Sequence, residues 1–123
     1  MNARHILAIL ASASFLSPQA FAHEAPARHG GVVRTVNDQQ YELVQKGPDA
    51  VIYVDNHGKP APTAGMTGNL VVLQGAEKTE FKLEATGENQ LAAKVEKAGS
   101  GAKAVAVINA PKAKAETVRF VVK

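Results

Sequence analysis

The sequence predicts an all-β protein, either a small antiparallel β-sandwich of immunoglobulin-like type or a small barrel, with about 7–8 strands. Two features of the chain support this prediction. Short runs rich in Val, Ile, Thr, Tyr and Phe recur at a spacing of roughly 8–12 residues. Turn-forming Gly, Pro, Asn and Asp residues separate these runs from one another.

The composition of the expected strands indicates that some are buried on both faces and others on one face only. The run 50–54 (AVIYV) is nearly all apolar, which is typical of a central strand buried on both faces. The run 79–84 alternates apolar and charged residues, and a turn at 86–89 leads into the run 90–95, which predicts a hairpin. The Ala- and Lys-rich stretch 92–98 lies between glycines and is too short for a stable helix. The complete set of expected strands is 32–36, 40–44, 50–54, 69–73, 79–84, 90–95, 104–108 and 117–122.

The first 22 residues have the organisation of a secretory signal peptide. Arg4 supplies a positive charge, residues 6–16 form an uncharged apolar run, and Ala20-Phe21-Ala22 provides the small residues of a cleavage site. The apolar run is shorter than the roughly 20 residues that cross a bilayer. We therefore expect export to the periplasm, cleavage after Ala22, and no membrane span after processing.

Cleavage at this position would leave 101 of the 123 residues, enough for one domain. We expect a signal peptide at 1–22, a flexible arm at 23–31 and a single β domain at 32–123. The mature chain would keep 13 of the 14 basic side chains against 11 acidic ones, a net charge of +2. Because these charges are interspersed and aromatic residues are few, nucleic acid is not an expected partner. The absence of cysteine excludes disulfides, CxxC redox motifs and cysteine-ligated zinc sites.

The sequence contains no recognisable catalytic motif. Ser100 lies in a Gly-Ser-Gly segment without the context of a nucleophile elbow. The segment 65–68 (GMTG) lacks the lysine of a phosphate-binding loop. Four acidic residues fall at alternating or flanking strand positions, where we expect a solvated face: Glu42, Glu80, Glu84 and Glu96. We therefore expect a protein that is not an enzyme.

Three histidines would remain after cleavage, and they are the candidate metal ligands. His23 would be the first residue of the mature chain, where its α-amine and Nδ1 can chelate one ion. Nitrogen ligands of this kind suit Cu(II). His29 or His57 would supply a second imidazole. The alternatives are a polar residue after a cleavage site for His23, an exposed arm residue for His29, and a tight-turn residue for His57.

Met66 is the only methionine beyond the signal peptide. Its thioether is a soft ligand suited to Cu(I), whereas within an apolar strand a methionine would be a filler of the core. It lies in a Gly-rich loop and is not part of an apolar strand. If the arm and two loops meet at one end of the β domain, His29, His57 and Met66 form a candidate ligand set for copper, with zinc as the alternative metal.

Several short motifs resemble those of small periplasmic proteins associated with heavy-metal and copper resistance. The motifs are His29-Gly30-Gly31, 41–44 (YELV), 52–60 (IYVDNHGKP) and 64–68 (AGMTG). They are also similar to the N-terminal β domain of periplasmic adaptors of metal-efflux (RND) systems. The resemblance covers roughly residues 29–91 and implies metal binding or delivery beside an efflux pump, with His29 as the matching position. It also implies an efflux adaptor or another envelope protein as the partner.

A second resemblance concerns His23, because small copper-resistance β-barrel proteins begin with histidine after processing. The internal sequence departs from that family, and an Asp-His pair near the C-terminus is missing. Two hypotheses follow from the sequence. The chain is a periplasmic carrier or buffer of copper or zinc, or it is a structural or protein-interaction module of the cell envelope that binds no metal.

Overall fold

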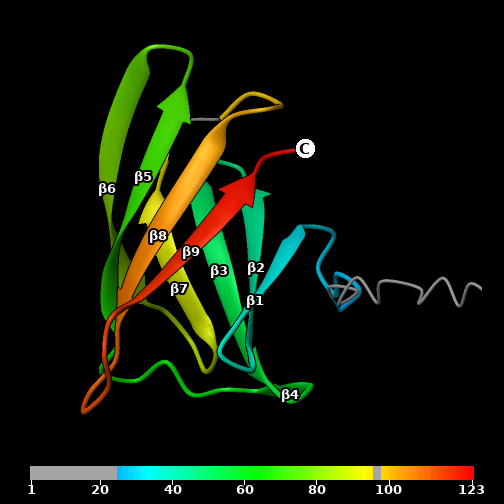
Figure 1. Cartoon of the computed structure of the whole chain (residues 1–123), viewed down its shortest axis with the longest axis vertical. Coiled ribbons are helices and arrows are strands. Elements are labelled where there is room, and N and C mark those ends of the chain that lie inside the picture. The colour runs from blue at the N-terminus through cyan, green and yellow to red at the C-terminus, as the bar shows by residue number, and fades with distance from the viewer. Residues whose placement is uncertain (1–24, 96–97) are drawn as a thin grey trace, which may run out of the picture.

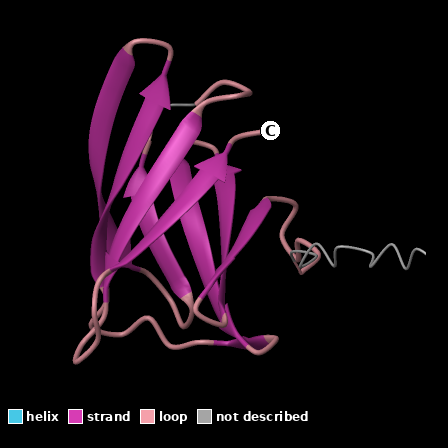
Figure 2. Cartoon of the chain, viewed as in Figure 1, coloured by secondary structure: helices cyan, strands magenta, loops and turns pink. Residues whose placement is uncertain are grey.

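The computed structural model describes residues 25–95 and 98–123, which form one antiparallel β-sheet that curls into a nearly closed barrel (Figures 1 and 2). The expected signal peptide, His23 and Glu96 lie outside the described residues. The strands are β1 (Val32–Val36), β2 (Gln39–Lys46), β3 (Asp49–Asn56), β4 (Lys59–Pro60), β5 (Thr67–Gln74), β6 (Glu77–Ala85), β7 (Gln90–Lys94), β8 (Lys103–Asn109) and β9 (Glu116–Val121). The all-β prediction is confirmed, and each of the eight expected strands is present. The sequence did not predict β4, a two-residue strand that pairs with the end of β3.

The strand order is β1-β2-β3-β7-β6-β5-β8-β9, with every neighbouring pair antiparallel. β1 also lies beside β9, so the sheet returns to its own first strand. β5, β6 and β7 follow one another through hairpins, and β8 returns to pair with β5, which is a Greek-key connection. Of the two architectures that the sequence left open, the structure therefore has the barrel, because its strands form one continuous sheet and not two packed ones.

Alternation along the strands separates the barrel interior from its outer surface. On β5, Leu70 and Val72 are buried while Asn69 is exposed. β3 departs furthest from this alternation, because five successive residues from Ala50 to Val54 are buried. One set of these side chains, including Ile52 and Val54, belongs to the core. The other set, Val51 and Tyr53, faces outward and requires a cover.

Two contacts fix the connections between strands. Thr63 is fully buried in the segment before β5, and its Oγ1 lies 3.1 Å from the carbonyl oxygen of Gln90 while its backbone N–H donates to Glu88 at 3.0 Å. Gly68 lies within β5 at a close approach to its paired strand β8. A Cβ at this position would be 2.4 Å from the carbonyl oxygen of Val107. Within the described ranges, no helix is long and apolar enough to cross a membrane.

Candidate metal-binding site

The end of the N-terminal arm is bound to the outer face of β2 through Glu42. The carboxylate of Glu42 accepts backbone N–H groups from Arg28 (2.9 Å, Oε1), His29 (2.8 Å, Oε2) and Gly31 (2.9 Å, Oε2). Gly31 also passes very close to β2, since a Cβ there would lie 2.2 Å from the carbonyl oxygen of Leu43. Glycine at this position therefore allows the arm to approach β2 closely enough for these hydrogen bonds to form.

Glu42 was expected on a solvated face, and this prediction is wrong, because the residue is only 6% exposed. Burial alone would raise the pKa of Glu42. The three backbone N–H donors from Gly31, Arg28 and His29, together with the charge of His29, outweigh burial and lower the pKa below its ordinary value. Glu42 is thus a buried carboxylate that stays ionised because the arm supplies its hydrogen-bond donors. Glu80 and Glu84 are exposed, as expected.

His29 packs on the outward-facing ring of Tyr53, the residue opposite Glu42 in the β2–β3 register. The two rings are stacked, with centroids 3.6 Å apart and planes inclined by 12°. The ammonium of Lys46 lies 4.9 Å from the Tyr53 ring centroid and contacts the Tyr53 hydroxyl. These neighbours leave Tyr53 only 4% exposed. The arm and Lys46 therefore cover the outer face of β3 at Tyr53.

The imidazole of His29 is exposed, although two contacts fix the residue. Its backbone N–H donates to Glu42, and its ring stacks on Tyr53. Among residues 25–95 and 98–123, no hydrogen bond reaches either ring nitrogen of His29. The stacking contact uses the face of the ring, so the nitrogens at its edge are left to bind other groups. An exposed imidazole held by stacking is suitable as a preorganised metal ligand.

Arg28 connects the arm to the turn that contains His57. Its guanidinium donates to the carbonyl oxygen of Gly58 at 2.8 Å and lies 3.8 Å from the carboxylate of Asp55. His57 and Gly58 both have positive φ angles, 48° and 78°, and Asn56 pairs with Lys59. These features define a tight two-residue hairpin turn. The prediction that His57 occupies a turn is confirmed, and its exposed side chain lies in the segment that Arg28 contacts.

Met66 lies on the other side of the sheet from His29. It packs against the core and lines a small cavity of about 80 Å³ together with Tyr41 and Glu116. Tyr41 points into the barrel, whereas the adjacent Glu42 points outward to the arm. The structure therefore connects His29 with the turn of His57 through Arg28, and does not bring Met66 to either of them. In the part of the chain that the structure describes, no three His, Asp or Glu side chains are grouped so that they could hold a metal ion.

A polar pair formed by the buried Tyr41 and the half-buried Glu116 was not anticipated from the sequence. The hydroxyl of Tyr41 donates to the carboxylate of Glu116 on β9, and it lies 2.7 Å from Oε1 of Gln39. Burial, the hydrogen bond to Glu116 and the charge of Glu116 all raise the pKa of Tyr41 far above its usual value. Tyr41 therefore stays protonated, and the pair connects β2 to β9 across the barrel end.

The remaining predicted ligand, His23, lies outside the described residues, so the structure gives no position for it. Comparisons with models of known protein families, with curated proteins and with solved structures return no match for this sequence. In the described part of the chain, His29, Glu42 and Tyr53 form an outward-facing group that combines a candidate ligand with residues that fix its position.

Proposed function

We propose that the chain is a periplasmic metal-binding protein that carries or buffers copper, with zinc as the alternative metal, beside a metal-efflux or resistance system. The supporting observation is the exposed imidazole of His29, stacked on Tyr53 and attached through its backbone to Glu42. A ligand that is already ordered loses little conformational entropy when it binds an ion. One imidazole is not a complete site, so the other ligands have to come from elsewhere in the chain.

His23 is the first of these ligands in our proposal. It precedes His29 by six residues on the same arm. If cleavage occurs after Ala22, its α-amine and Nδ1 chelate the ion and the His29 ring completes a three-nitrogen set of the kind that Cu(II) favours. His57 is an alternative source of the second imidazole, because Arg28 joins its turn to the arm. Met66 is left out of this set because it lines the interior cavity.

The test is calorimetric titration of the mature protein, beginning at His23, with Cu(II), Cu(I) and Zn(II). We expect a site with a dissociation constant of about 1 μM or tighter. His29→Ala and His23→Ala each weaken it by about tenfold or more. His57→Ala determines whether His57 also binds the ion. Tyr53→Phe is the matched control, because it keeps the aromatic face under His29 and should retain the affinity of the parent protein.

Two results would refute the proposal. One is the absence of any site in the micromolar range for all three ions. The other is an unchanged affinity in His29→Ala when circular dichroism shows the variant to be folded. Cleavage after Ala22 is tested separately by mass spectrometry of exported protein. A mature chain that begins at any residue other than His23 has no terminal chelate.

The alternative function is a protein-interaction module of the envelope that binds an efflux adaptor or another envelope protein without any metal. A separate part of the barrel, on the side of β6 and β7, supports an interaction of this kind.

A further inference from the structure

The barrel has a lateral opening between β6 and β7. These strands pair only near their shared turn, where Glu84 lies opposite Ala92 and Ala85 opposite Leu91. β6 continues for seven further residues, from Leu83 back to Glu77, and these are paired with β5 alone. β7 meanwhile remains paired with β3 as far as Lys94. The two strands therefore separate, and the sheet is interrupted along most of β6.

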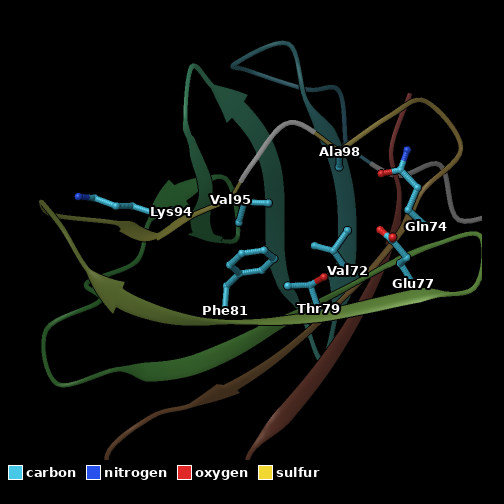
Figure 3. Close-up of a pocket in the computed structure, with 8 residues that line it drawn as sticks. All are labelled: Val72, Gln74, Glu77, Thr79, Phe81, Lys94, Val95 and Ala98. Carbon is cyan, nitrogen blue, oxygen red and sulfur yellow. The ribbon is translucent and has the colours of Figure 1, made fainter.

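A cavity lies on each side of the sheet at this opening, and the two cavities share lining residues. The inner cavity, about 480 Å³, is lined by Val72, Phe81, Val95 and Ala98, with Thr79 and Glu77 further along β6 (Figure 3). The outer cavity, about 460 Å³, is lined by Lys82, Glu84 and Ala92 but also reaches the inward-facing Phe81 and Ala93. Phe81 and Lys94 border both cavities. Phe81 is consequently half-buried although it belongs to the inward-facing set.

At this opening, the edge of β6 presents backbone groups that have no hydrogen-bond partner among residues 25–95 and 98–123. Thr86 donates its N–H to Gln90, so its backbone points toward β7. The direction of the N–H and C=O groups alternates from residue to residue along a regular strand. The backbone groups of Lys78, Glu80 and Lys82 therefore point to the same side as those of Thr86. The register of β6 with β5 continues without a bulge from Glu77 to Glu84, so this alternation is not interrupted. Within the described ranges, no hydrogen bond reaches the N–H or C=O groups of these three residues.

We propose that this opening binds an extended peptide segment of a partner protein, which adds a strand beside β6. The unpaired groups of Lys78, Glu80 and Lys82 fit an extended backbone of about five residues. Side chains on one face of that strand enter the inner cavity, where apolar residues suit the part lined by Phe81, Val72 and Val95. The rest of this cavity is lined by polar residues, among them Gln74, Thr79 and Lys94. Side chains on the other face lie opposite the charges Lys78, Glu80 and Lys82, so an acidic, a basic and an acidic residue complement them.

A second copy of this chain fits the opening less well. If two β6 edges pair so that Lys78 lies opposite Glu80 of the second copy, the carboxylate of Glu77 is brought opposite the apolar ring of Phe81. If Lys78 lies opposite Lys82 of the second copy, all facing charges are alike. If Glu80 lies opposite Lys82 of the second copy, Lys78 has to lie opposite Glu84. The backbone of Glu84 is already paired with Ala92 on β7. Each register has a specific penalty that a different peptide avoids.

The experiment uses metal-free mature protein and the synthetic peptide acetyl-Glu-Val-Lys-Val-Glu-amide, whose symmetric charge pattern suits either strand direction. We expect saturable binding with a dissociation constant of about 1 mM or tighter. On binding, amide exchange at Lys78, Glu80 and Lys82 slows, whereas amides that already pair with β5, such as that of Phe81, are protected in the free protein as well. This pattern identifies the edge directly and does not depend on any variant.

Glu80→Pro and Glu80→Ala form the matched pair of variants. Proline removes the N–H that faces the opening and leaves the β5–β6 ladder intact, since the backbone at position 80 does not bond to β5. We expect Glu80→Pro to bind the peptide about tenfold more weakly, and Glu80→Ala to bind within about twofold of the parent protein. Thermal unfolding of both variants verifies that the barrel is retained.

Three results would overturn the inference. The first is a lack of binding at millimolar peptide in folded protein, and the second is peptide-induced protection confined to residues outside β6 and β7. The third is dimerisation in sedimentation experiments that Glu80→Pro abolishes, because the opening would then accept a second copy in place of a partner peptide.

Discussion

The carboxylate of Glu42 determines where the arm lies, because its two oxygens accept three backbone N–H groups at a position that is 6% exposed. Glu42→Gln keeps the size of the side chain but removes its charge and one acceptor oxygen. We expect this variant to lose about 1–3 kcal/mol of unfolding free energy, since three backbone N–H groups of the arm lose a charged acceptor. Urea unfolding measures the loss, and Glu80→Gln, at an exposed acidic position, should change the free energy by less than about 0.5 kcal/mol.

The same residue predicts a dependence of stability on pH. The pKa of Glu42 is lower in the folded protein than its ordinary value of 4.5. A depressed folded-state pKa stabilises the fold above the unfolded value, and the stabilisation is lost as the pH falls through the folded value. The difference in unfolding free energy between the parent protein and Glu42→Gln should therefore be largest at neutral pH and shrink below pH 4.5. A difference that stays constant between neutral and acidic pH would contradict this assignment.

At the scale of elements, the segment between β4 and β5 is attached to the β6–β7 turn by a single buried residue. Thr63 is fully buried, and its Oγ1 lies within reach of the carbonyl oxygen of Gln90. Thr63→Val has the same shape but no hydroxyl, so the carbonyl oxygen of Gln90 keeps the N–H of Thr86 as a donor and loses the hydroxyl. We expect a loss of about 1–2 kcal/mol in unfolding free energy. Thr67→Val, at an exposed position on the adjacent strand β5, is the control and should change stability little.

The strands themselves could be predicted from the sequence because each β-branched run stops at a strong turn signal. Asn37-Asp38 and His57-Gly58 illustrate this, since all four residues adopt positive φ angles between paired strands. β4 could not be predicted in the same way, because Lys59–Pro60 becomes a strand only through its pairing with β3. The choice between sandwich and barrel depends on long-range pairing, such as that of β3 with β7, which local patterns do not contain.

The candidate site was predictable only in part. His29 was identified from residue type, but Glu42 and Tyr53, which position it, were not. Glu42 alternates with Tyr41 and Leu43 as a solvated residue would, and the arm that buries it is distant in sequence. One signal was present: the run 50–54 is apolar on both faces, so something had to cover Val51 and Tyr53. The sequence does not separate Met66 from the histidines, because the position of a residue in a loop does not indicate which side of the sheet it faces.

At the scale of the whole molecule, closure of the barrel places one continuous core inside a single sheet. Residues from all parts of the sheet contribute to it, including Tyr41, Ile52, Leu83, Leu91 and Phe120. In the absence of cysteine, this core must supply most of the stability, and small domains of this kind have only about 5–15 kcal/mol in total. The same closure separates His29, outside the barrel, from Met66, inside it, so a metal site at the arm and the interior packing can be changed independently.

Two leucines on β5 distinguish the inside of the barrel from the outside. Leu70 is 1% exposed in the core, where it lies opposite Phe81 on β6 and Ala106 on β8. Leu73, three residues later, faces outward and is half-buried. We expect Leu70→Ala to lower the unfolding free energy by about 2–5 kcal/mol, because it leaves a cavity in the core. Leu73→Ala should lower it by about 1 kcal/mol, since the side chain is already partly in water. Equal effects of the two substitutions in urea unfolding would mean that β5 does not have one face in a common core, and the barrel topology would then be wrong.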